Sequence, residues 1–189
     1  MNNNTQSLNP DREQITVRPL EHSDLADFCR HLVRLDRRSR WMRFNHAMDD
    51  GALQAYALNI AGSSTCLIGA YDGETLRAVV ELSPLNNVGQ PLVELAFTVE
   101  PEVQNCGIGS KLMKAALEAI GEATAVLVCR SDNTAMCRVA ERFGGVYAPG
   151  NGLVTFRIQT EQPAQATEFA SYRSTSHGGD NLATAYGYA

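Results

Sequence analysis

Long hydrophobic runs are missing from this sequence of 189 residues. No stretch approaches the roughly 20 apolar residues that a membrane-spanning helix needs, so neither an integral membrane protein nor a membrane partner is expected. The N-terminal segment Met1–Ser7 has no basic region followed by an apolar stretch, and we therefore expect no secretory signal. Together these absences predict a cytoplasmic protein.

Signatures of metal sites and disulfides are also missing. The five cysteines are odd in number, and no two of them have C-x-x-C spacing. This pattern predicts neither a disulfide framework nor a zinc site. The four histidines form no metal-binding spacing either, so no metal is expected. Reduced thiols are the simplest account, and they agree with a cytoplasmic compartment.

Positive charge is scarce, since the formal net charge is -5. Nucleic acid is not expected as a partner, because binding to phosphates needs clustered Lys and Arg. One local exception has two interpretations, a solvated basic end of a helix or a docking patch for an anion or substrate. Its members are Arg34, Arg37, Arg38, Arg40 and Arg43.

The hydrophobic pattern alternates between strand and helix periods, which predicts an α/β fold. Strands are expected at 15–19, 66–71, 76–83, 92–99, 125–129 and 153–158. Helices are expected from Ser23 to about Arg37, from Asp49 or Asp50 to Ile60, at 108–120 and at 135–143. The strands at 92–99 and 125–129 are joined by a helix, and a crossover of this kind predicts that they run parallel.

Composition divides the chain into three parts. A single domain is expected over 14–160, preceded by a loose polar arm over 1–13. Beyond about residue 160 the aliphatic residues nearly vanish, which predicts a disordered tail over 161–189.

The most informative stretch is the turn between the strand at 92–99 and the helix at 108–120. Gly107 and Gly109 let the backbone approach a ligand closely, because they carry no Cβ. The start of a helix also presents unpaired N–H groups and a partial positive charge, which together suit a diphosphate. A P-loop and a dinucleotide fingerprint both fail on spacing, since Lys111 does not follow a glycine and Leu112 replaces the third glycine.

The pattern Gln104-x-x-Gly107-x-Gly109 resembles the coenzyme A signature of the GCN5-related N-acetyltransferases (GNAT family). The resemblance extends over about residues 15–158 and includes the strand Val93–Val99, the segment Asp132–Met136 and Arg142–Gly145. It implies a single domain with a mixed, twisted sheet of about seven strands flanked by about four helices. Arg40–Phe44 and Ser131–Met136 further resemble the bacterial protein-lysine acetyltransferase branch.

The resemblance also implies a site. Acetyl-CoA would be the co-substrate, with its pantetheine arm in a gap beside the fourth strand and its diphosphate on the turn. Asn133 would contact the pantetheine or the acceptor, although it is equally suited to cap the helix that follows. The cofactor-binding residues expected on this basis are Phe97, Thr98, Val99, Gln104, Asn105, Cys106, Gly107, Ile108, Gly109, Ser110 and Asn133.

Acetyl transfer to an amine needs a base, because an alkylamine is protonated at neutral pH. Glu94 is the candidate, since a carboxylate within this apolar strand is unusual and the lysine-acetyltransferase branch has a Glu at the matching position. An exposed face of an antiparallel strand is the alternative explanation. Glu81 is the reserve candidate, with a salt-bridged strand residue as its alternative, and Glu100 and Glu102 are expected to be solvated.

The sequence departs from the family at one position, because Ala140 stands where many members carry a Tyr that acts as the acid. Three functions therefore stay open: acetylation of a protein lysine, acetylation of a small amine, and a coenzyme A-binding regulatory module without catalysis. The segments 36–50 and 144–152 are expected to shape the acceptor pocket. A homodimer also stays open.

Overall fold

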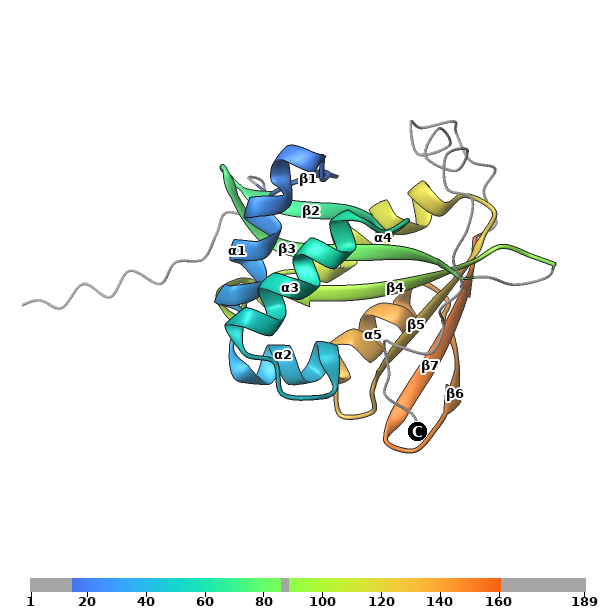
Figure 1. Ribbon diagram of the computed structural model, residues 1–189. Coiled ribbons are helices and arrows are strands. Elements are labelled where there is room, and N and C mark those ends of the chain that lie inside the picture. Colours follow the sequence, from blue (N-terminus) through green and yellow to red (C-terminus); the bar gives the residue numbers. More distant parts are fainter. Residues whose placement is uncertain (1–14, 86–88, 161–189) are drawn as a thin grey trace, which may run out of the picture.

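A seven-stranded mixed sheet forms the centre of the protein, and the order of its strands is β1-β2-β3-β4-β5-β7-β6 (Figure 1). The computed structural model describes residues 15–85 and 89–160, so the arm predicted over 1–13 and the tail predicted over 161–189 lie outside the described residues. The strands are β1 (Ile15–Pro19), β2 (Cys66–Asp72), β3 (Thr75–Leu85), β4 (Leu92–Val99), β5 (Thr124–Arg130), β6 (Val146–Pro149) and β7 (Leu153–Gln159). The predicted α/β class and the seven strands are confirmed.

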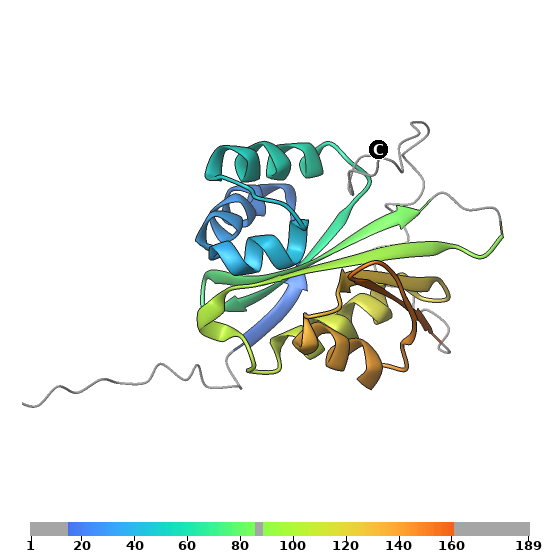
Figure 2. The same cartoon turned by 90° about the horizontal axis from the view of Figure 1, so that it is seen from below.

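Helices cover both faces of the sheet, as Figure 2 shows from below. One face carries α1 (Leu25–Arg34), α2 (Arg37–Phe44) and α3 (Asp50–Ala61), and the other carries α4 (Ile108–Ile120) and α5 (Thr134–Arg142). The alternation of side chains along the strands divides the interior into two cores. Val79, for example, packs with Phe28 and Leu32 of α1, whereas its neighbour Val80 packs on the side of α4.

The described residues contain five α-helices where about four were expected. The helix predicted from Ser23 to about Arg37 ends early, at Arg34, and helix α2 was not predicted. His22–Asp24 form a 3-10 turn, and Leu35 adopts an extended conformation that ends α1. Asp36 then caps a new helix, because its carboxylate accepts a hydrogen bond of 2.7 Å from the backbone N–H of Ser39. This local cap begins the helix that the hydrophobic pattern did not predict.

Strand β6 is a second difference from the prediction, which placed residues 144–152 in a loop. All four residues of β6 are exposed, and the strand pairs with β7 alone at the edge of the sheet. Because none of its residues is buried, β6 needs no alternation of apolar and polar residues, and the sequence pattern therefore does not predict a strand here.

The sheet opens between β4 and β5. The two strands run parallel, as predicted, but they pair only through Leu92–Glu94 and Thr124–Val126. Beyond these residues β5 continues to pair with β7 as far as Arg130, while β4 continues with β3 as far as Val99. The strands therefore diverge, and the facing edges of Leu95–Val99 and Leu127–Arg130 are not joined by a ladder.

Candidate active site

The turn after β4 presents a row of unused backbone donors. Pro101–Val103 form a short 3-10 helix, and α4 begins at Ile108 with Gly107 as its N-cap. Asn105 and Gly107 have positive φ values of 59° and 82°. Within the described part of the chain, no protein acceptor meets the N–H groups of residues 105–109. Consecutive donors of this kind form a concave anion site at the positive end of a helix.

Gly107 is required by its backbone conformation and not by crowding. A Cβ at this position would meet nothing within 4 Å, but the φ of 82° is one that L side chains rarely adopt. The predicted role of Gly107 in a close approach to a ligand is consistent with the open space above it.

Gln104 and Ser39 join α2 to this turn. The Gln104 amide donates to the carbonyl of Val99 at 3.0 Å and to Oγ of Ser39 at 3.1 Å. At the other end of α2, Asn45 accepts a hydrogen bond of 3.1 Å from Arg130, and the Arg130 guanidinium lies 5.8 Å from the centre of the Trp41 ring. Helix α2 is therefore attached on both sides of the opening, to the segment after β4 and to the end of β5.

Three of the predicted residues on β4 divide between the two faces of the strand. Phe97 and Val99 pack against the core beneath α4, whereas the hydroxyl of Thr98 is buried on the side of α1 and lies 2.8 Å from Nε2 of His31. The side chain of Thr98 is thus occupied by its contact with His31.

Glu100 corrects the sequence prediction, because it is buried and not solvated. Its side chain is 1% exposed and accepts hydrogen bonds from three cationic or imidazole donors. Nδ1 of His31 donates at 3.0 Å, Nε of Arg34 at 2.8 Å and Nη1 of Arg77 at 2.9 Å. Burial alone would raise the pKa of Glu100, but the bonds from His31, Arg34 and Arg77 outweigh it and lower the pKa to about 2.

His31 is the other buried titratable group of this network. Burial lowers its pKa, against the opposing effect of the hydrogen bond to Glu100. Because the carboxylate can only accept, Nδ1 carries the proton and Nε2 of the neutral ring accepts from Thr98. The sequence did carry a signal for this residue, since His31 follows Phe28 by three positions on the buried stripe of α1. The network fixes the end of β4 directly ahead of the turn.

Glu94 lies half-buried on the face of the sheet that carries α1–α3. The register places it beside Ser83 of β3 and beside Val126 of β5, at the last pair before the two parallel strands diverge. A carboxylate here is therefore adjacent to the opening, on the face opposite α4.

Glu81, the reserve candidate, is buried and paired with Arg43 and Tyr56. It is 2% exposed, accepts a hydrogen bond from the Tyr56 hydroxyl, and lies 3.1 Å from Nη2 of Arg43. Arg43 also donates to the Tyr56 hydroxyl at 2.8 Å. This is the salt-bridged strand residue given above as the alternative for Glu81.

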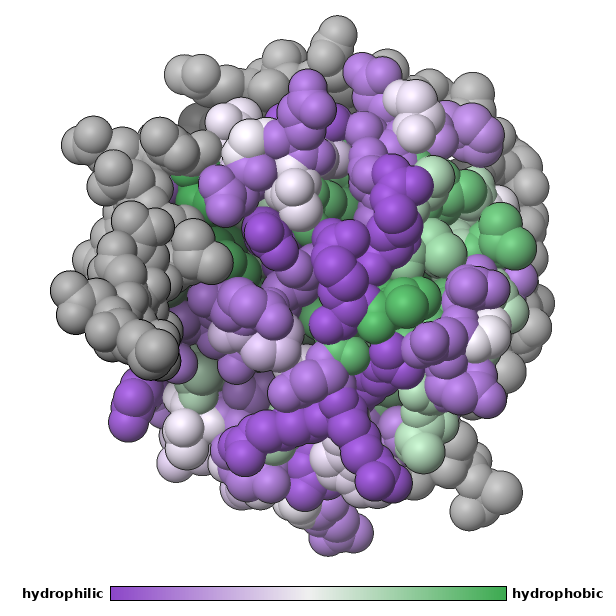
Figure 3. Space-filling view, turned by 90° about the vertical axis from the view of Figure 1, so that its left-hand side faces the viewer, coloured by the Kyte–Doolittle hydropathy of each residue, from purple (hydrophilic) through white to green (hydrophobic). Residues whose placement is uncertain are grey.

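Three of the five arginines between Arg34 and Arg43 bind other groups of the protein. Arg40 donates to the carbonyls of Leu35 and Val33 at 2.9 and 2.7 Å, so it holds the break between α1 and α2. Arg34 and Arg43 bind the buried carboxylates described above, which leaves Arg37 and Arg38 as exposed members of the run. Figure 3 shows that the left-hand side of the molecule in Figure 1 is mostly hydrophilic, with small hydrophobic areas between the polar side chains.

Helix α5 begins at the other side of the opening. Asn133 caps it by accepting a hydrogen bond of 3.2 Å from the N–H of Met136, so the capping role expected as one alternative is present. Ala140 is fully buried. Sγ of Cys137 lies 3.9 Å from Sγ of Cys129, whose pKa is raised to about 12 by burial and by its neighbour.

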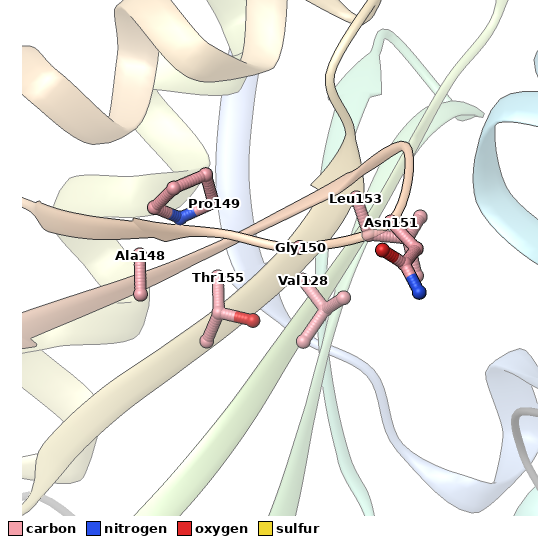
Figure 4. Close-up of a pocket in the computed structure, with 7 residues that line it drawn as sticks. All are labelled: Val128, Ala148, Pro149, Gly150, Asn151, Leu153 and Thr155. Atoms are coloured by element: carbon pink, nitrogen blue, oxygen red, sulfur yellow. The ribbon is translucent and has the colours of Figure 1, made fainter.

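A hollow of about 340 Å³ lies on β5, β6 and β7, and the turn between β6 and β7 closes one end of it (Figure 4). Its lining includes Val128, Leu153, Thr155 and the turn residues 149–151. Part of the predicted acceptor segment 144–152 is therefore found here, whereas the strand residues Val128 and Thr155 were not anticipated.

Two features are absent from the described residues. Over residues 15–85 and 89–160, no His, Cys, Asp and Glu side chains gather in groups of three or more that could hold a metal ion. No helix within these ranges is long and apolar enough to cross a membrane.

Comparisons with known proteins agree with this architecture. The model of the Acetyltransferase (GNAT) family matches residues 26–145, whereas no curated protein sequence matches the chain. Three solved structures share the fold at low sequence identity. The GNAT domain of S. lividans PAT is 18% identical with a TM-score of 0.64, and the match covers 76% of this chain and 89% of that chain.

The other two structures come from Vibrio species. Spermidine N-acetyltransferase from Vibrio cholerae, in complex with CoA and spermine, is 20% identical with a TM-score of 0.58, over 77% of this chain and 94% of that chain. Ribosomal-protein-S5-alanine acetyltransferase from Vibrio fischeri is 11% identical with a TM-score of 0.60, over 79% of this chain and 95% of that chain.

Proposed function

This chain belongs to the GNAT acetyltransferase family, and we propose that it transfers the acetyl group of acetyl-CoA to a primary amine, with Glu94 as the general base. One observation carries the proposal. The divergence of β4 from β5 lies directly ahead of a turn whose five N–H groups, those of residues 105–109, have no acceptor among the described residues.

The cofactor would use both features. Its diphosphate would accept hydrogen bonds from the turn between Gln104 and Ser110, where a bond to a charged oxygen is worth about 1.5–3 kcal/mol. Its pantetheine arm would lie between Leu95–Val99 and Leu127–Arg130, and would bond to backbone groups that lack a ladder partner there. Asn133 would lie at the far side of the same opening, where its side chain already caps α5. Most of the proposed contacts with the cofactor are therefore made by backbone groups and few by side chains.

The chemistry follows from the position of Glu94. The neutral amine attacks the thioester carbonyl, the C–N bond forms, and the C–S bond breaks to release the CoA thiolate, while the nitrogen loses its surplus proton to water. An acceptor amine with a pKa of about 10.4 must first lose a proton, at a cost of about 4.6 kcal/mol at pH 7. Glu94 accepts that proton, directly or through water, at the point where the strands separate.

No acid from α5 assists the leaving group in this proposal, because Ala140 has no ionisable side chain. A thiol with a pKa of about 8.5 is a good leaving group near neutral pH, so water suffices to protonate it. The absence of the usual Tyr is therefore compatible with catalysis.

For the acceptor, we propose a protein lysine. The resemblance of Arg40–Phe44 and Ser131–Met136 to the lysine-acetyltransferase branch supports this choice. The second candidate is a small amine, which is supported by the structural similarity to spermidine N-acetyltransferase from Vibrio cholerae. Thiol release from acetyl-CoA, measured with denatured and native protein acceptors and with a panel of small amines, separates the two.

The cofactor site is tested by Gly107→Trp, with Gly73→Trp as its matched control. Both glycines have positive φ and open space around a Cβ, but Gly73 lies in the turn between β2 and β3. We expect Gly107→Trp to abolish CoA binding in isothermal titration calorimetry, and Gly73→Trp to bind CoA as the parent does. Equal binding by the two variants would refute the assignment of the turn.

A further inference from the structure

The hollow in Figure 4 lies on the same face of the sheet as Glu94. Register shows this, because Glu94 pairs with Val126, and Val128 follows two residues later on the same face of β5. Val128 pairs with Thr155 of β7, and Thr155 pairs with Ala148 of β6. This row of three residues therefore lies about 7 Å along the strands from the row of Glu94.

The hollow also adjoins the opening of the sheet. Val128 belongs to the part of β5 that no longer pairs with β4, so one side of the hollow faces the proposed path of the pantetheine. An amine positioned between Glu94 and the thioester would extend the rest of its molecule over Val128 and Thr155, towards the turn at 149–151.

Charge determines which molecules fit. Among the described residues, the lining of the hollow contains no charged side chain. The nearest charged positions by register are Glu94 and Arg157, which share one row, and Arg130, in the row of Leu153. Arg130 binds Asp132 at 2.9 Å, and Glu94 is the proposed base for the reacting amine. A second ammonium group on the acceptor would lie against Val128, Leu153 and Thr155 between two guanidinium groups, with no carboxylate in the lining to receive it.

We propose that this hollow binds the stem of the acceptor, and that it selects a single primary amine on an uncharged aliphatic stem over a polyamine. The inference rests on the proposed function and names the substrate class of that site. Val128, Leu153 and Thr155 are the specificity-determining residues, since each contributes a side chain to the lining. The four methylene groups of a lysine side chain form such a stem, and they pack readily on an apolar surface.

Two series of amines test the proposal with the full chain. For n-alkylamines from propylamine to hexylamine, kcat/KM should rise about threefold to fourfold with each methylene group until the hollow is filled. 1,4-Diaminobutane should react at least about tenfold less efficiently than butylamine, because its second ammonium group would lie in the hollow without a carboxylate partner in the lining.

Thr155→Asp tests the lining directly, since it places a carboxylate in the hollow. We expect it to raise the ratio of kcat/KM for 1,4-diaminobutane over butylamine by about tenfold or more. Leu58→Asp is the matched control, because Leu58 is an apolar residue of α3 that is 67% exposed and lies outside the hollow. Leu153→Glu, at the start of β7, is the second variant and should change the ratio in the same direction if Thr155→Asp does not fold.

The outcomes separate this proposal from the proposed function. Affinity for CoA, measured by calorimetry on each variant, reports an intact fold and cofactor site. If the parent acetylates both amines with equal efficiency, and neither variant changes the ratio while CoA still binds, the hollow does not select the acceptor. If the parent binds CoA and acetylates no amine at all, the proposed function itself fails, and this inference fails with it.

Discussion

The buried carboxylate of Glu100 offers a prediction with a clear magnitude. Glu100→Gln keeps the shape of the side chain but removes the charge that His31, Arg34 and Arg77 surround. The pKa of Glu100 falls from 4.5 to about 2 in the folded protein. At about 1.4 kcal/mol for each tenfold change, this corresponds to about 3 kcal/mol of folding free energy at neutral pH.

The expected loss is visible in a thermal melt. For a protein of this size, about 3 kcal/mol lowers Tm by about 6–12 °C. Glu102→Gln is the matched control, because Glu102 lies two residues away but is exposed, and its substitution should leave Tm nearly unchanged.

The pH dependence has a definite sign. A carboxylate whose pKa is lowered on folding stabilises the protein above its unfolded pKa, and this stability is lost as the pH falls towards the folded pKa. The difference in Tm between the parent and Glu100→Gln should therefore be full above about pH 5 and shrink between pH 4.5 and about pH 2. His31, whose pKa is lowered by burial, destabilises both proteins as the pH falls below 6.5. Its effect is at least as large in Glu100→Gln, because the carboxylate that opposes this lowering is absent there, so His31 cannot account for a difference that shrinks.

A Glu100→Gln protein that melted like Glu102→Gln would refute the reasoning. A difference in Tm that stayed constant down to pH 2 would also refute it, because protonation of Glu100 in the parent should make the two proteins alike at that pH.

Three further predictions follow from the site. Glu94→Gln should lower kcat for an amine acceptor by about 10²–10⁴ at pH 7 and recover in part at high pH, with CoA affinity unchanged; full activity at pH 7 would remove Glu94 from its role. Asn133→Ala should lose the cap of α5 and destabilise the protein by about 1 kcal/mol in denaturant unfolding, and Asn133→Ser should restore it. If the Asn133 amide also contacts the pantetheine, both variants should bind CoA more weakly than the parent. Equal CoA affinity for the parent and both variants would show that Asn133 acts only as the cap of α5. Gly145→Ala should lower Tm, because its Cβ would lie 2.8 Å from the carbonyl oxygen of Ala140, and an unchanged Tm would contradict this contact.

The sequence predicted the elements whose hydrophobic period is long and clear. The parallel pair β4 and β5 and the cap of α3 by Asp49 are both confirmed. The cap depends on a carboxylate that reaches a nearby N–H group, and the parallel pair follows from the helix that joins the two strands.

The predictions for Glu100 and Arg34 were wrong because their environments depend on residues that are far away in the sequence. Glu100 seemed solvated because it follows a strand in a polar stretch, yet its partners come from α1 and β3. Arg34 was placed in a basic run for the same reason, although it binds Glu100 across 66 positions of sequence. Helix α2 was missed because its first turn, Arg37–Arg40, contains no apolar residue that would show a helical period.

The site was predictable only in part. The turn at 104–110 has a local pattern, and its left-handed glycine at position 107 is found in the structure. The hollow beside Val128 and Thr155 depends on how β5, β7 and β6 line up, and this register is set by pairing between strands that are far apart in the sequence.

A crystal structure of the protein with coenzyme A tests the central proposal most directly. The account predicts that the diphosphate lies on the N–H groups of residues 105–109 and that the pantetheine passes between Leu95–Val99 and Leu127–Arg130. A nucleotide bound anywhere else, with the space between β4 and β5 filled only by water, would contradict it.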